Sequence, residues 1–318
     1  MLRLVFVVAL LPWQVAYLLP STAVVRRAVN ALILGGAVSG GGTLLQLVAG
    51  GGIIPGGEVT DQGRFTGFTG HVSDAGGIAA LTVVLSLSGL TKASARMTKF
   101  VSLIGLTGGA LGLILSGSVS AMIAVAAGVI VLLLLKALRF QTAILMMLLA
   151  GAAFLFAIGL QSGTGALSPV ERIEQTLGLS ADGRYNTSET RIETYGAAFD
   201  GFLASPLVGN GLDPASALAD GIFPAHNLFV GAMFQGGLFL ACGLALAIVL
   251  PLGRWIRLSR SVLVAQVLAG FTAMVVFAMT APSLYNRYLW IPVALLFALK
   301  RIEEARPHFP KASERSAK

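Results

Sequence analysis

Long apolar runs recur along the whole sequence, and they restrict the possible folds more than any other feature. Many extend over roughly 18–25 residues with few or no charged side chains. Because an α-helix rises about 1.5 Å per residue, a run of this length crosses the roughly 30 Å hydrocarbon core of a bilayer. The sequence therefore predicts an all-α polytopic membrane protein, folded as a single membrane domain over residues 1–318.

About nine transmembrane helices are expected from the apolar runs. Only 11% of the residues are charged, against about 25% in soluble domains, which agrees with this class. The expected spans cover residues 2–20, 28–54, 75–91, 98–116, 119–136, 140–161, 227–251, 261–281 and 285–300. Two polar segments between them, 55–74 and 162–226, are long enough to carry chemistry outside the membrane.

The 22 Lys and Arg residues are divided unevenly between the two sides of this arrangement. One side, which holds the short loops and residues 301–318, carries 16 of them and three acids, whereas the other carries six of them and eleven acids. Short loops rich in Lys and Arg mark the cytoplasmic face. We therefore expect a cytoplasmic C-terminal tail at 301–318 and external positions for 55–74 and 162–226. The net charge of +8 follows from this topology, and no nucleic-acid partner is expected.

The same arrangement places Met1 outside, which is unusual for an initiator end. Arg3 makes a weak signal-peptide n-region, and Pro12 interrupts the first apolar run. Two explanations stay open. Either the chain lacks an odd number of N-terminal helices, or the spans near residues 35–52 are miscounted.

The external segment 162–226 carries its own helix signals. Ser168 to Glu171 matches a capping box, which predicts a helix over 169–178. A second helix start appears at Thr187, and its apolar residues follow at helical spacing until Ser205 and Pro206 end it. The segment is therefore predicted to be a folded lid of two short helices at the outer membrane surface.

Several residues of the external side are candidates for a site. Arg191 lies in the first turns of the second lid helix, where a cation is mildly unfavourable unless an anion compensates it. His226 lies at the boundary between the lid and an apolar span, and Asn227 is placed to cap the helix that follows. Arg184 belongs to the lid, and Arg287 at the start of the last span is either an interface anchor or a ligand-binding cation.

Three stretches together resemble the O-antigen ligase/polymerase superfamily of bacterial envelope glycosyltransferases. RIETYGAAFDGFLASPLVGNGL at 191–212 is similar to the lid pattern of an arginine, an amphipathic helix and Pro-Leu-x-Gly-x-Gly. AHNLFVGAMFQGGLFL at 225–240 resembles the His-Asn pair before a span with a glycine turn, and GRFTGFTGHVSDAGG at 63–77 resembles an upstream Arg-x-x-Gly segment. The likeness covers roughly residues 55–300.

The resemblance implies a GT-C-like membrane architecture of about twelve spans, with the large external loop between the ninth and tenth. Three additional N-terminal helices would reconcile that count with the sequence, so the chain looks short at its N-terminus. Two departures from the family pattern stand out. The turn at 116–120 lacks the arginine that often occupies it, and residues 71–74 replace a usual Asn-Pro-Asn stretch.

The implied reaction moves a glycan from a polyprenyl-pyrophosphate donor to a hydroxyl of a glycan or lipid-glycan acceptor, at the periplasmic face of the bacterial inner membrane. Arginine suits a pyrophosphate because its fork binds phosphate oxygens in pairs, and histidine suits proton acceptance near neutral pH. Arg191 would bind the pyrophosphate, His226 would be the base, and Arg64 would help to hold the donor. Arg184, Arg287 and Asn227 are further substrate-binding candidates. The scheme expects no metal and no cofactor.

Two other classes stay open. A transporter or flippase of a lipid-linked or amphipathic substrate is the alternative, although almost no charged residue falls inside the expected spans. An inactive or scaffolding member of the family is the third possibility. The acceptor stays open between a lipid core, a growing repeat and a protein.

Overall fold

A computed structural model describes most of the chain. It covers residues 6, 10–60, 62–90, 95–144, 148, 151, 174, 187–212, 218, 224–250, 252, 261–281 and 284–305. Every regular element in these ranges is a helix, and the only β-type pairings there are the isolated bridges Val59–Phe65 and Leu218–Pro224.

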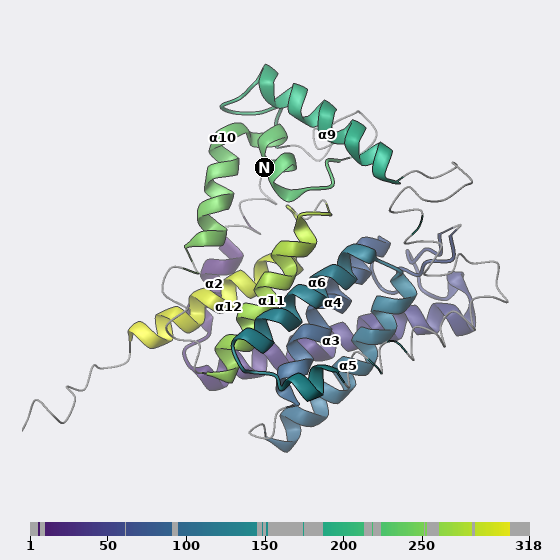
Figure 1. Cartoon of the computed structure of the whole chain (residues 1–318), viewed down its shortest axis with the longest axis vertical. Coiled ribbons are helices and arrows are strands. Elements are labelled where there is room, and N and C mark those ends of the chain that lie inside the picture. Colours follow the sequence, from purple (N-terminus) through teal and green to yellow (C-terminus); the bar gives the residue numbers. More distant parts are fainter. Residues whose placement is uncertain are drawn as a thin grey trace, which may run out of the picture.

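The helices follow the apolar runs of the sequence (Figure 1). Their bounds are α2 Leu11–Leu18, α3 Thr22–Ala49, η2 Gly51–Ile53, α4 Val72–Gly89, α5 Arg96–Ser116, α6 Val119–Leu134, α9 Thr187–Ala204, α10 Leu228–Val249, α11 Val262–Ala278 and α12 Arg287–Glu304. Four of them, α3, α4, α5 and α10, are long and apolar enough to cross a membrane, and α6 and α11 are shorter apolar helices.

The predicted all-helical membrane fold is thus confirmed in outline. Most expected spans coincide with a helix within a few residues, although α3 begins at Thr22 rather than at residue 28. The last helix continues to Glu304, so it includes the first residues of the segment 301–318. The expected span 140–161 lies mostly outside the described residues, as does the first lid helix at 169–178, so the count of nine spans stays a prediction.

Small residues let the central helices approach closely. A Cβ atom added to Gly40 of α3 would lie 1.8 Å from the carbonyl oxygen of Gly108 in α5, so the two backbones touch. Such contacts stabilise helix pairs in membranes, where lipid removes the usual hydrophobic driving force between helices. Around this pair, α4 packs against α3, α5, α6 and α11, and α11 packs in turn against α6 and α12. Trp290, Phe277 and Ile33 are among the largest fully buried side chains of the resulting core.

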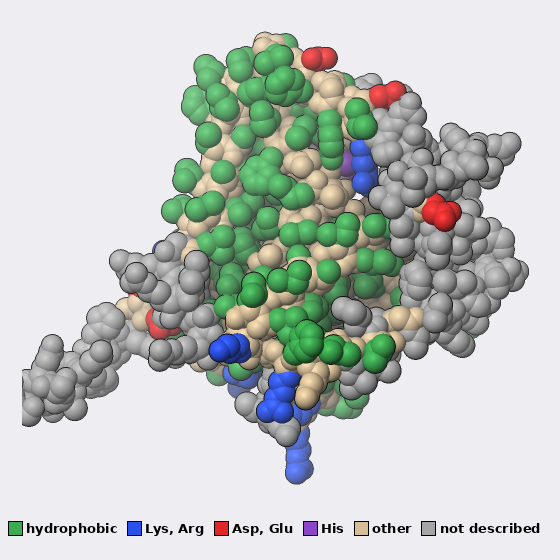
Figure 2. All heavy atoms as spheres, viewed as in Figure 1, with side chains coloured by type: hydrophobic (Ala, Val, Ile, Leu, Met, Phe, Trp, Pro, Cys, Tyr) green, Lys and Arg blue, Asp and Glu red, His purple; other side chains and the backbone are tan. Residues whose placement is uncertain are grey.

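The outward faces of these helices are apolar. Val38 of α3, Phe100 of α5, Leu134 of α6 and Val249 of α10 are each between 59% and 74% exposed. Figure 2 shows hydrophobic side chains over much of the visible helical surface. A surface of this kind is stable when hydrocarbon surrounds it.

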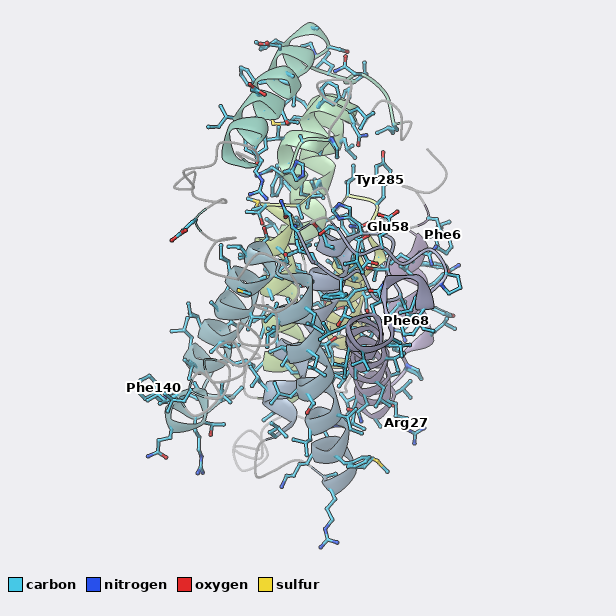
Figure 3. The ribbon with its side chains drawn as sticks, turned by 90° about the vertical axis from the view of Figure 1, so that its right-hand side faces the viewer. Phe6, Arg27, Glu58, Phe68, Phe140 and Tyr285 are labelled. Atoms are coloured by element: carbon cyan, nitrogen blue, oxygen red, sulfur yellow. The ribbon has the colours of Figure 1, made fainter. Side chains whose placement is uncertain are left out.

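The two ends of the bundle differ in charge. One end, here called the lid end, carries α9, the α3–α4 loop, the turn between α5 and α6, and the starts of α10 and α12. The opposite, basic end carries the starts of α3 and α5 with Arg26, Arg27, Arg96 and Lys99. Lys and Arg side chains gather at the lower end in Figure 2, and Figure 3 shows Glu58 and Tyr285 far above Arg27 and Phe140.

Candidate functional site at the lid end

The second lid helix is present as predicted. It is α9, which runs from Thr187 to Ala204 and crosses the top of the molecule in Figure 1. The apolar residues of α9 do not all face the protein. Tyr195 is half-buried against it, whereas Ile192 and Phe199 are 70% and 52% exposed. Thr194 and Ala198 complete the buried face. A helix with one protein-facing side and one exposed apolar side suits a position at a membrane surface.

A glycine-rich clasp fixes the C-terminal end of this lid to α10. It consists of residues 206–211, whose backbone pairs with a break in α10 at Gly237, where φ is +59°. The amides of Asn210 and Gly211 donate to the carbonyls of Phe234 and Gln235, both at 2.9 Å, and the amide of Leu238 donates to Pro206 at 2.8 Å. The break exposes backbone groups that a continuous helix would use itself, and the clasp satisfies them.

The clasp explains why glycine is required in this motif. Gly209 has a φ of +67°, and a Cβ atom there would lie 2.4 Å from the carbonyl carbon of Gln235. A Cβ atom on Gly237 would lie 2.4 Å from the carbonyl carbon of Leu207. The Pro-Leu-x-Gly-x-Gly pattern is visible in the sequence, but nothing in it indicates that the segment inserts into a broken helix.

Tyr195 connects the two residues predicted to be catalytic. Its phenol donates a hydrogen bond of 3.0 Å to the backbone carbonyl of His226. One helical turn earlier on α9, Arg191 lies close enough for its charge to act on the same phenol. Burial raises the pKa of Tyr195 above its ordinary value, and the positive charge of Arg191 opposes that rise. The phenol is therefore a neutral hydrogen-bond donor under ordinary conditions.

The Arg191 side chain is partly buried. Its Nε atom is buried and has no hydrogen-bond partner among the residues that the structure describes. A buried donor of a cation that lacks an acceptor is costly, so this nitrogen is a candidate contact for a ligand oxygen. His226 is half-buried, and its Nδ1 atom is buried.

Asn227 caps α10, as predicted. Its Oδ1 accepts from the amides of Phe229 at 2.9 Å and Val230 at 3.2 Å. Its Nδ2 donates to the carbonyl of Met279 at 3.1 Å, which ties the start of α10 to the end of α11. The cap therefore fixes the backbone immediately after His226. Both the oxygen and the nitrogen of the Asn227 amide are used in these hydrogen bonds.

Arg64 reaches the turn between α5 and α6. Its Nε donates to the carbonyl of Ser116 at 2.7 Å, and the neighbouring amide of Phe65 donates to Leu115 at 3.1 Å. Gly117 at this turn is left-handed with a φ of +57°, and Ser118 caps α6 by accepting from Ala121. The turn lacks an arginine in the sequence, but the fold brings the guanidinium of Arg64 to it from another segment.

Asp74 of α4, which is not among the predicted site residues, fixes the start of α12 through its carboxylate. Asp74 Oδ1 accepts from Asn286 Nδ2 at 3.0 Å and from the phenol of Tyr288 at 2.9 Å. Arg287 lies between these two donors in the chain and is exposed. It makes no hydrogen bond or ion pair to any other residue within the described ranges. Nearby, His71 caps α4 by accepting from the amide of Ser73 at 3.1 Å.

Tyr285, just before α12, contacts α10 and the residue that follows the clasp. Its phenol donates to Gln235 Oε1 at 3.2 Å and approaches the carbonyl of Leu212 at 3.4 Å. Arg64, Arg191, His226, Asn227 and Arg287 are thus all at the lid end.

Two further points concern the rest of the predicted set. Arg184 lies outside the described residues. Within those residues, no three His, Cys, Asp or Glu side chains form a group that could hold a metal ion.

Residues 100–245 match a family model described as O-Antigen ligase. The match extends from α5 almost to the end of α10, so it includes Arg191, the clasp, His226 and Asn227. Arg64 and Arg287 lie outside the matched residues. A comparison with curated proteins finds no match to the chain.

Proposed function

Because residues 100–245 place this chain in the O-antigen ligase/polymerase superfamily, we propose that it is a membrane glycosyltransferase. It moves a glycan from a polyprenyl-pyrophosphate donor to a sugar hydroxyl of a glycan or lipid-glycan acceptor. One observation carries the proposal: the buried Nε of Arg191 in α9 has no hydrogen-bond partner among the described residues, and the charge of Arg191 acts on a phenol that is bonded to His226.

The lid end is the periplasmic face of the bacterial inner membrane in this proposal. The basic end faces the cytoplasm, together with the C-terminal segment, because Lys and Arg in short loops are retained on that side. The donor and acceptor both remain anchored in or near the membrane, so a site at the membrane surface meets them directly. The exposed apolar residues Ile192 and Phe199 of α9 are suited to contact the lipid interface there.

Arg191 is the main ligand of the donor pyrophosphate. In the reaction, the bond between the sugar C1 and the pyrophosphate oxygen breaks, and the electron pair leaves with the pyrophosphate. A guanidinium at this position stabilises the developing negative charge, and its effect is strong because the group is partly withdrawn from water. The phosphate oxygen also supplies an acceptor for Arg191 Nε, which has none among the described residues.

His226 is the base that activates the acceptor. Its imidazole takes the proton of the acceptor hydroxyl while the new bond to the sugar C1 forms. The hydrogen bond from Tyr195 and the Asn227 cap hold the backbone of His226 in place on both sides. A fixed base is effective because the reacting atoms must meet within hydrogen-bond reach.

Arg64, Arg184 and Arg287 add positive charge around the donor. Arg64 provides it at the α5–α6 turn and Arg287 at the start of α12. Asn227 contributes by holding the start of α10 rather than by contacting the glycan. Because arginines neutralise the leaving pyrophosphate, the transfer proceeds without a metal ion or another cofactor.

A transporter or flippase of a lipid-linked substrate is the second candidate. Such proteins usually carry ionisable groups within the membrane to couple or bind their cargo. In the described part of the chain, every buried polar side chain is Ser, Thr or Gln. This composition favours the transferase over the transporter.

The test uses membranes that contain the full chain and a lipid-linked donor. We expect Arg191→Ala and His226→Ala each to abolish glycan transfer at unchanged protein level, while Arg27→Ala at the basic end transfers normally. Full transfer by both site variants would refute the mechanism. A transporter would instead move the lipid-linked glycan across the bilayer unmodified in all three proteins.

The surface polysaccharide separates the two enzyme types. Loss of a ligase leaves full-length polymer that is not attached to its acceptor. Loss of a polymerase leaves single repeats. Glycan length and attachment in cells with and without the chain therefore identify the acceptor class.

A further inference from the structure

An apolar groove lies between α2, α3, α4 and α12. Its volume is about 710 Å³, within the range of roughly 300–1,000 Å³ that small-molecule sites occupy. The residues that line it include Val15 of α2, Leu32 and Gly35 of α3, Ile78 of α4, and Ile291 and Leu295 of α12. Among the described residues that line it, only Arg287, at the start of α12, is charged.

We propose that this groove binds the hydrocarbon chain of the polyprenyl-pyrophosphate donor, with Arg287 as a second cation, besides Arg191, at the end of the groove that faces the pyrophosphate. The inference rests on the proposed function and names where its lipid substrate lies. It assigns a role to α2, α3 and α12, which all fall outside the residues of the family match.

The groove has the polarity of an anionic amphiphile. Arg287 marks the lid end, since the adjoining Asn286 and Tyr288 are bonded to Asp74 in the first turn of α4. From Arg287 to Leu295 the lining runs eight residues along α12, which is about 12 Å toward the basic end. A cation at the membrane surface followed by an apolar channel matches an anionic head group followed by a hydrocarbon tail.

Arg287 is available for such a head group. The nearby carboxylate of Asp74 accepts from Asn286 and Tyr288, and the Arg287 guanidinium forms no ion pair or hydrogen bond with a residue that the structure describes. A guanidinium that forms no ion pair with the described residues can bind two phosphate oxygens through its fork of N–H donors. The tyrosine hydroxyl at the same place is turned to Asp74, and its ring contributes to the groove lining.

The groove also lies where the reaction needs it. During transfer the polyprenyl chain stays in the bilayer while its pyrophosphate is held at the lid end. The tail must therefore leave the site through the side of the bundle. Tyr285 fixes the start of α12 against the lid clasp through Gln235 and Leu212, so Arg287 and the clasp belong to one polar end.

Gly35 allows the groove to be filled without disturbing the fold. No heavy atom lies within 4 Å of a Cβ added there, and the residue lies inside α3, so leucine is compatible with its backbone. Gly41 is the matched control, because it lies on the same helix, also has no atom within 4 Å of an added Cβ, and is not part of the lining. Gly36 is unsuitable, since an added Cβ would meet Thr82.

The first test compares Gly35→Leu and Gly41→Leu in lipid nanodiscs with two donors, one with a long polyprenyl chain and one with two isoprene units. We expect Gly35→Leu to raise the KM for the long-chain donor about tenfold, because isoprene units lose their buried apolar contact. The short-chain donor and the Gly41→Leu control should behave like the unmodified protein. An unchanged KM of Gly35→Leu for the long-chain donor would overturn the groove but leave the transferase proposal intact.

The second test does not depend on transfer. A polyprenyl pyrophosphate that carries a photoreactive group near the end of its tail should cross-link to peptides of α3 or α4, and Gly35→Leu should reduce this labelling. Excess unlabelled polyprenyl pyrophosphate should compete, whereas excess phosphatidylglycerol should not. Labelling that avoids these helices, or equal competition by phosphatidylglycerol, would refute the assignment. If the unmodified protein is labelled in this way but transfers no glycan, the proposed function is wrong while the groove assignment stands.

Discussion

The phenol of Tyr195 donates a 3.0 Å hydrogen bond to the backbone carbonyl of His226, and it thereby attaches the lid helix to the residue just before the N-cap of α10. The two residues are 31 positions apart in the chain. Arg191 lies one turn from Tyr195 on the same helix, so this contact helps to fix the position of Arg191 relative to His226. A shift of the lid helix would therefore also change the distance between Arg191 and His226.

Loss of this hydrogen bond should slow transfer without unfolding the protein. Tyr195→Phe keeps the ring but removes the donor, and a net hydrogen bond is worth about 0.5–1.5 kcal/mol, or up to roughly tenfold in rate. We expect kcat to fall by about that factor while the KM for the donor changes little. Tyr17→Phe in α2 is the control, since it removes a phenol far from the lid. Equal kcat values for both variants would show that Tyr195 does not position the site.

The pH dependence of the transfer rate should distinguish the role of His226 from that of Tyr195. An ordinary imidazole titrates near pH 6.5, so a histidine base loses activity as the pH falls through that region. The raised pKa of Tyr195 keeps its phenol protonated throughout the neutral range, so Tyr195→Phe should show the same acid limb as the unmodified protein at a lower plateau. Rate profiles between about pH 5 and 9 test this. An acid limb that disappears in Tyr195→Phe would contradict the assignment of the base.

Tyr195 should also make stability depend on alkaline pH. Its folded-state pKa is raised above the ordinary 10.0, so folding favours the protonated phenol. That stabilisation is complete below pH 10.0 and is lost as the pH rises through the folded-state value. Thermal unfolding midpoints of the unmodified protein should fall more between about pH 9 and 11 than those of Tyr195→Phe. Parallel curves would mean that the phenol is not held as described.

The glycine clasp should be essential for lid attachment. Gly209→Ala places a Cβ 2.4 Å from the carbonyl carbon of Gln235 and forces a left-handed alanine, which costs on the order of 1–2 kcal/mol before the clash is counted. Gly196→Ala on α9 is the control, because no atom lies within 4 Å of its added Cβ. We expect faster proteolysis of the lid and loss of transfer in Gly209→Ala only. Normal transfer by Gly209→Ala would show that the clasp is not needed to place Arg191.

Much of this arrangement could be predicted from local patterns. Apolar runs located the helices, Thr187 and Ser205 bounded the second lid helix, and Asn227 was recognised as a cap. These features depend on residues close together in the sequence. Helix periodicity and capping chemistry act within a few positions, so one sequence is sufficient to detect them.

The contacts between distant segments could not be predicted in this way. Asp74 bonds to Asn286 and Tyr288 more than 200 positions later, and Arg64 reaches Ser116 across 52 positions. Nothing near these residues in the sequence specifies the partner. Helical spacing groups Tyr195 with the apolar residues of α9, because periodicity cannot distinguish a ring that packs from a phenol that donates a hydrogen bond.

Asp74 should act through hydrogen bonding more than through charge. Asp74→Asn keeps an oxygen that can accept from Asn286 and Tyr288, whereas Asp74→Ala leaves both donors without that acceptor. We expect Asp74→Ala to raise the KM for the donor several-fold by loosening the start of α12 next to Arg287, and Asp74→Asn to remain near normal. Equal loss in both variants would indicate that the carboxylate charge itself takes part in the reaction.

Arg64 should matter for its guanidinium geometry as well as its charge. Its Nε donates to the carbonyl of Ser116 at 2.7 Å, which fixes the orientation of the guanidinium at the α5–α6 turn. Lysine keeps the charge but cannot bond to the turn and a phosphate in the same fixed geometry. Arg64→Lys should therefore raise the KM for a pyrophosphate donor by about tenfold, and Arg64→Gln by more, with kcat reduced less than in Arg191→Ala. Donor titrations with each variant measure the difference, and a KM for Arg64→Lys equal to that of the unmodified protein would leave Arg64 with a purely structural role at the turn.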